Sequence, residues 1–147
     1  MDHTANANQE IDAKPEVIFP WLTEPQKRLK WIEGCSEITP ISDGPLDVGA
    51  RWVEVHDMGG REYEFEFEIT DYDPPGRLRC TAHARPKFRS VITYIVESGL
   101  SAHSVTIVHK TRFRGWIQRF LGRIMAKGLD HKIQRDLERL KAVIEGA

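Results

Sequence analysis

The chain has 147 residues, of which 40% are hydrophobic and 29% charged, and this is the size of one globular domain with a substantial core. Its 21 basic and 22 acidic side chains give a net charge of -1, which excludes the global basic excess of nucleic-acid-binding proteins. No apolar run approaches the ~20 residues that span a bilayer, and the start of the chain does not resemble a signal peptide. We therefore expect a single cytoplasmic domain, residues 1–147, without stable membrane insertion.

The charges are unevenly distributed along the chain. Residues 54–73 contain eight acidic side chains and one basic side chain, whereas residues 110–141 contain ten basic and three acidic side chains. Two explanations are open from the sequence alone. Each run is either the solvated face of one structural element or part of an electrostatic site for a charged partner.

The first part of the chain predicts one strand and two short helices. The strand, residues 4–12, is weakly patterned because two asparagines disfavour it. Pro15 is typical of the first turn of a helix, which we expect to continue through Leu22. Residues 23–26 (Thr-Glu-Pro-Gln) have the spacing of a capping box, which predicts a second helix that ends near residues 31–34.

Turn signals rich in glycine and proline then separate short segments with strand character. The clearest is residues 62–69, where apolar side chains alternate strictly with four glutamates, so half of the acidic run forms the wet face of a strand. We expect six strands after the helices, joined as an antiparallel meander. The sequence defines five of them: residues 51–57, 62–69, 78–84, 88–96 and 104–113. Gly59 and Gly60 predict a hairpin turn, and the buried face of residues 51–57 stays unassigned.

Apolar side chains recur every 3.6 residues from Gly115 to Glu145, which predicts one helix of roughly 45 Å that lies across the sheet. Gly122 and Gly128 each weaken this helix by about 1 kcal/mol relative to alanine, so we expect a kink or a close approach in its first half. The helix also carries a basic stripe, Arg119, Arg123 and Lys127. This stripe is either a solvated face or a contact with an acidic partner or a membrane surface.

Several short motifs follow one another along nearly the whole chain: residues 13–19 (Ala-Lys-Pro-Glu-Val-Ile-Phe), 30–31, 48–52, 69–75, 91–94 and 137–141. In this order and spacing they resemble the helix-grip proteins of the START/Bet v 1 superfamily, and within it the bacterial polyketide cyclase/dehydrase-like (SRPBCC) group. The resemblance implies an α+β fold in which a seven-stranded, curved antiparallel sheet wraps around a long C-terminal helix, with two short helices between the first two strands. It also implies a pocket for an apolar ligand between sheet and helix.

Strand alternation places His109 on the inner face of the last strand, where we expect it to line this pocket with aromatic and apolar neighbours. The candidate ligand-pocket residues are Tyr63, Phe65, Phe67, Tyr94, Ile107, His109, Trp116, Phe120 and Ile124. His109 either packs there without a chemical role or acts as a general base while a tyrosine hydroxyl polarises a substrate carbonyl. The aromatic side chains either pack in the core or contact the ligand.

The sequence contains no pattern that is typical of a metal or cofactor site. The histidines show no HxxxH or HxH spacing, and no GxSxG, P-loop or GxGxxG motif occurs. Cys35 and Cys80 are not part of a CxxC motif, so we expect two reduced thiols, with Cys35 in a loop and Cys80 as a small buried side chain. We therefore expect no metal and no cofactor.

Three functions compete at this point, because a fold does not decide among them. We favour binding of a small hydrophobic ligand, such as a lipid, an isoprenoid or a polyketide-like molecule, by a monomer or homodimer. The second is a polyketide cyclase or dehydratase, for which His109 is the best catalytic candidate. The third is a protein-interaction factor that uses the acidic strand face or the basic helix. A nucleic-acid partner is not expected.

Overall fold

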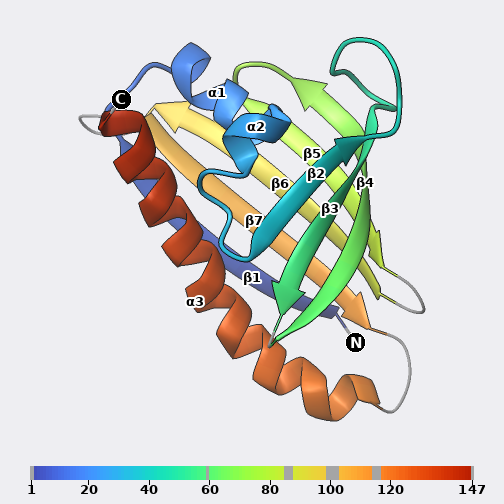
Figure 1. Cartoon of the computed structure of the whole chain (residues 1–147). Coiled ribbons are helices and arrows are strands. Elements are labelled where there is room, and N and C mark those ends of the chain that lie inside the picture. Colours follow the sequence, from blue (N-terminus) through green and yellow to red (C-terminus); the bar gives the residue numbers. More distant parts are fainter. Residues whose placement is uncertain (1, 59, 85–87, 99–102, 114–116, 147) are drawn as a thin grey trace.

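A computed structural model describes residues 2–58, 60–84, 88–98, 103–113 and 117–146 of the chain (Figure 1). Its strands are β1 (Asp2–Ile11), β2 (Cys35–Pro40), β3 (Arg51–Met58), β4 (Arg61–Asp73), β5 (Arg77–Ala84), β6 (Phe88–Ser98) and β7 (His103–Phe113). Its helices are α1 (Pro15–Thr23), α2 (Pro25–Arg28) and α3 (Ile117–Glu145). The seven strands form one antiparallel sheet in the order β1-β7-β6-β5-β4-β3-β2.

This architecture confirms the expected helix-grip fold. Strands β2 to β7 form a meander in which each strand pairs with the next, and β1 returns to the far edge beside β7. Figure 1 shows the curved sheet with α3 running along its β1 side, and with α1 and α2 near the C-terminal end of α3. The weakly patterned first strand is real, because β7 pairs with β1 along its whole length, from Asp2 to Ile11.

The second helix is shorter than the sequence predicted, and the predicted capping box does not form. α2 ends at Arg28, and its N-cap residue Glu24 makes no side-chain capping bond. The Thr23 hydroxyl instead lies 3.5 Å from the carbonyl oxygen of Phe19 and 3.4 Å from that of Pro20, within α1. The reason is that α1 continues through Thr23, where a hydroxyl bonds back to the preceding turn.

Cys35 was expected in a loop, but it is the first residue of β2, where it pairs with His56 of β3. A bulge follows between Cys35 and Glu37, and Ile38 is the one buried side chain of the strand. This edge strand therefore lacks the regular alternation that identifies strands in a sequence.

The alternation in β4 is confirmed from Phe65 onward. Phe65, Phe67 and Ile69 are buried, whereas the glutamates between them point outward, so this part of the acidic run is a strand's wet face. Arg51 of β3 forms an ion pair with Glu66 across this outer face. The hairpin turn after β3 is confirmed at Gly60, which has a φ of +83° and donates its N–H to Asp57 Oδ1 at 2.9 Å.

The second half of α3 packs against β1 and β7 through Ile133, Leu137, Leu140 and Ile144, which follow the predicted helical period. Asp130 Oδ1 accepts the backbone N–H of Asn6 at 3.1 Å. Figure 1 also shows α3 changing direction in its first half, as the sequence indicated. The predicted close approach of another segment does not occur at Gly128, since a Cβ there would meet no atom within 4 Å. None of the described helices is long and apolar enough to cross a membrane.

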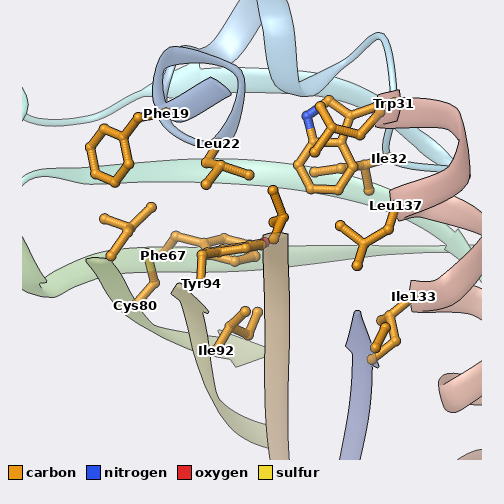
Figure 2. Close-up of a cluster of buried hydrophobic side chains, with 14 of the residues drawn as sticks. Phe19, Leu22, Trp31, Ile32, Phe67, Cys80, Ile92, Tyr94, Ile133 and Leu137 are labelled. Carbon is orange, nitrogen blue, oxygen red and sulfur yellow. The ribbon is translucent and has the colours of Figure 1, made fainter. Parts of the chain in front are cut away.

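The hydrophobic core lies between the inner face of the sheet, α1, the segment after α2 and the second half of α3. Figure 2 shows Tyr94 and Phe67 of the sheet beneath Leu22 and Trp31, with Leu137 of α3 beside them. Cys80 is 1% exposed, and both cysteines are free thiols, as expected. The core therefore joins all parts of the described fold around one set of inward-facing side chains.

Candidate functional site

An ion pair lies buried in this apolar interior. The side chains of Arg28, the last residue of α2, and Glu54, in the middle of β3, are 2% and 0% exposed. Arg28 Nε donates to Glu54 Oε2 at 2.7 Å and Nη2 donates to Oε1 at 3.2 Å, so the contact is bidentate. Charges removed from water this completely are found only where they are paired and hydrogen bonded.

The remaining contacts of Arg28 fix its position. Nη1 donates to the carbonyl oxygen of Leu22 at 2.8 Å and to the Tyr94 hydroxyl at 3.3 Å. The guanidinium carbon lies 5.6 Å from the ring centroid of Phe67 and 5.8 Å from those of Trp52 and Tyr94. Burial opposes the charge of Arg28, but the Glu54 carboxylate holds the pKa of this guanidinium well above its usual value. Arg28 is therefore a fixed cation inside the core.

Glu54 accepts two further hydrogen bonds from its own strand. Trp52 Nε1 donates to Oε2 at 2.8 Å, and His56 Nε2 lies 2.9 Å from Oε1. Burial favours the neutral acid, but Arg28 and His56 lower the pKa of Glu54 to about 2, so it is a carboxylate at neutral pH. Strand alternation puts the side chains of Trp52, Glu54 and His56 on the inner face of β3. The sequence alone had left open which side chains of this strand face inward.

Tyr94 of β6 borders the ion pair from the sheet side. It is 5% exposed, and burial raises the pKa of its hydroxyl to about 12 although Arg28 opposes this shift. Trp31 packs edge-on against it with 6.3 Å between ring centroids, and Trp31 Nε1 donates to the carbonyl oxygen of Trp21 at 2.7 Å. The hydroxyl of Tyr94 is therefore protonated and can donate a hydrogen bond within the core.

His109 points to the inner face of β7, as expected, but its environment makes it a weak base. Its Nε2 lies 3.0 Å from the hydroxyl of Ser90. Burial, followed by the charges of Lys132 and His56, lowers the pKa of His109 to about 4. His109 is therefore neutral at physiological pH and has little tendency to accept a proton.

The other candidate pocket residues fall into three groups. Phe65 and Phe67 are buried on the inner face of β4, whereas Tyr63 is 36% exposed near the hairpin end of that strand. Ile107, Phe120 and Ile124 belong to β7 and α3, but their side chains lie outside the described part of the structure, as does Trp116 as a whole. The described part thus brings together Phe67, Tyr94 and His109 on one face of the sheet.

Arg28, Glu54 and His56 were not among the residues that the sequence indicated. Glu54 was counted in the acidic run and the facing of its strand was left open, but this side chain is completely buried. The available signal was Trp52, since a large aromatic residue at the parity of Glu54 and His56 favours burial of that face. Arg28 carries no such signal because α2 is a polar single turn whose burial depends on tertiary packing.

An open cleft of about 390 Å³ lies elsewhere, between α1, the loop after β2 and the β4–β5 turn. It is lined by Glu16, Phe19, Pro20, Thr23, Glu24, Leu46, Tyr72, Pro74 and Pro75. None of the expected pocket residues belongs to it. This cleft is therefore distinct from the expected pocket between sheet and C-terminal helix.

Comparisons with known proteins agree with this fold. The model of a protein family described as "Polyketide cyclase / dehydrase and lipid transport" matches residues 2–145. Among curated proteins, none matches the sequence.

Several solved structures resemble the chain at low sequence identity. TTHA0849 from Thermus thermophilus is 14% identical with a TM-score of 0.81, and the match covers 97% of each chain. MLL2253 from Mesorhizobium loti is 20% identical with a TM-score of 0.72 and 98% of each chain covered. The protein Ara h 8.0201 is 12% identical with a TM-score of 0.77, and both chains are covered completely. These similarities concern the fold.

Proposed function

Since the chain belongs to the polyketide cyclase/dehydrase and lipid transport family, we propose that it binds a small hydrophobic ligand between the inner face of its sheet and α3. The proposed ligand is a lipid, an isoprenoid or a polyketide-like molecule. Its pocket would be lined by Phe65, Phe67, Tyr94, Ile107, His109, Trp116, Phe120 and Ile124, with Tyr63 at the rim.

The observation that carries this proposal is the composition of the inner face of the sheet. Small side chains occupy this face beside the aromatic residues: Ala5 and Ala7 of β1, Ala82 of β5 and Ser90 of β6, each at most 5% exposed. Small side chains on the inner face of a curved sheet favour an enclosed volume between that face and the helix that packs along its β1 side. The buried hydroxyl of Tyr94 would supply a directed contact of the kind that such a site needs to orient a ligand.

A filling substitution tests the proposal directly. Ala82→Leu adds bulk to the inner face of β5, whereas Thr81→Leu adds bulk to the outer face one residue earlier. We expect saturable binding of the amphipathic fluorophore 1-anilinonaphthalene-8-sulfonate to the folded wild-type protein. Ala82→Leu should weaken it by ~10-fold or more and Thr81→Leu should leave it unchanged. Equal binding by all three folded proteins would contradict the proposed pocket.

A cyclase or dehydratase is the second candidate, and the contact between Glu54 and His56 favours it. Because Glu54 is ionised, its Oε1 accepts a hydrogen bond from the protonated Nε2 of His56, and the lone pair of the neutral ring lies on Nδ1. A histidine that a carboxylate orients in this way is suited to act as a base. His56 would then take the role that the sequence suggested for His109. Turnover of a supplied polyketide should be lost in His56→Gln and kept in His109→Gln, and the reverse result would return the role to His109.

A further inference from the structure

A thiol, a carboxylate and an imidazole meet at the junction of β2 and β3. One ligand atom from each of Cys35, Glu54 and His56 lies within 4.8 Å of the other two. Cys35 pairs directly with His56 across the two strands, and Glu54 lies two residues earlier on the same face of β3. Both strands belong to the sheet, so the three side chains are held by rigid elements.

We propose that Cys35, Glu54 and His56 bind a zinc ion, with a water molecule in the fourth position. Thiolate and imidazole ligands favour zinc over magnesium or calcium, and zinc accepts carboxylate as well. Three protein ligands with one open position are typical of zinc sites that can also bind a small molecule. His56 is 15% exposed, so the open position can reach water.

Hydrogen bonds around Glu54 hold its carboxylate so that one oxygen, Oε1, is placed to bind the ion. Oε2 is held by Arg28 Nε at 2.7 Å and by Trp52 Nε1 at 2.8 Å. Oε1 has a longer contact with Arg28, 3.2 Å, and faces His56. Hydrogen bonds from neighbouring residues orient carboxylate ligands in the same manner in metal sites. We infer that Oε1 and His56 Nε2 bind the ion, and that the proton on Nε2 moves to Nδ1, so that His56 stays neutral.

This inference is independent of the proposed function, because it requires no organic ligand. Titration of the reduced full-length protein with Co²⁺, followed by Zn²⁺, tests it. Co²⁺ should bind at one ion per chain, with the near-ultraviolet charge-transfer absorption of a cobalt–thiolate bond, and Zn²⁺ should abolish this absorption. Cys35→Ser should remove the charge-transfer band, and His56→Gln should weaken binding by ~10-fold or more.

Two matched variants serve as controls. Cys80→Ser removes the other thiol, which is buried in β5, and His131→Gln removes an exposed histidine of α3. Both should bind Co²⁺ as the wild type does. A wild-type protein without the charge-transfer band would overturn the proposal, as would a band that persists in folded Cys35→Ser.

Discussion

The guanidinium of Arg28 and the carboxylate of Glu54 meet inside the core, with 2.7 Å between Nε and Oε2 and at most 2% of either side chain exposed. This pair joins α2 to the middle of β3, two segments that are 26 residues apart. Arg28 also hydrogen bonds to Tyr94, and Glu54 to Trp52 and His56. The polar end of the interior is thus organised by one ion pair.

Removal of one partner of this pair should strongly destabilise the fold. Arg28→Met leaves the Glu54 carboxylate buried without its counter-ion, which typically costs about 3–5 kcal/mol of unfolding free energy. The double variant Arg28→Met/Glu54→Leu should regain part of that loss, because no buried charge is left, although Trp52 Nε1 and His56 lose their acceptor. Urea unfolding monitored by circular dichroism measures both. A loss below about 1 kcal/mol in Arg28→Met would contradict a buried Glu54 carboxylate that depends on Arg28 as its counter-ion.

The lowered pKa of Glu54 predicts a loss of stability in acid. The unfolded chain binds a proton at Glu54 near pH 4.5, whereas the folded protein does so only near pH 2. The contribution of Glu54 is therefore complete above about pH 4.5 and is lost as the pH falls towards 2. Unfolding free energies measured across this range should fall more steeply for the wild type than for the double variant Arg28→Met/Glu54→Leu. Parallel curves would contradict this assignment.

His109 should affect the stability of the fold over a higher pH range than Glu54 does. Its folded pKa is lowered to about 4 from an ordinary value of 6.5, so the unfolded chain takes up this proton first as the pH falls. Stability linked to His109 is complete above about pH 6.5 and is lost between pH 6.5 and 4. Histidine resonances followed by NMR should include one, absent from His109→Gln, that titrates near pH 4. A His109 resonance that titrates near 6.5 would contradict the buried environment described above.

Both cysteines should react slowly with thiol reagents at neutral pH. Burial is the main cause that raises the pKa values of Cys35 and Cys80 to about 12 from an ordinary 9, so the thiolate population falls roughly 1000-fold. Cys35 should react first because it is half-buried, whereas Cys80 is 1% exposed and requires opening of the sheet. The single variants Cys35→Ser and Cys80→Ser assign each rate in a reaction with dithiobisnitrobenzoate. Rapid modification of Cys80 in the folded protein would contradict its burial.

The fold could be predicted from the sequence because its signals are local. Phe65, Phe67 and Ile69 alternate with glutamates over enough residues to define a strand, and the apolar positions of α3 repeat over about eight turns of helix. The sequence did not locate β2, because a bulge and a single buried side chain leave no such repeat. The capping box predicted at Thr23 was wrong, since its hydroxyl can form hydrogen bonds either at the end of one helix or at the start of the next.

The candidate site was harder to predict because it is formed by contacts between distant segments. Spacing along the chain excluded a metal cluster, yet strand pairing brings Cys35 next to His56 across 21 positions. The facing of Glu54 stayed open, because only the position of Arg28 shows why a carboxylate can be buried there. Alternation in β7 predicted that His109 lies on the inner face of the sheet. It does not predict the pKa of the side chain, which depends on burial and on neighbouring charges.

Native mass spectrometry of freshly purified protein, treated with a chelator to remove metal, tests the proposed ligand binding most directly. We expect a population heavier than the chain by the mass of one small organic molecule, which extraction into an organic solvent removes. The extracted protein should then bind one apolar fluorophore per chain, and Ala82→Leu should not. A chain that carries no added mass in repeated preparations, and that binds no fluorophore while folded, would contradict the proposed ligand-binding function.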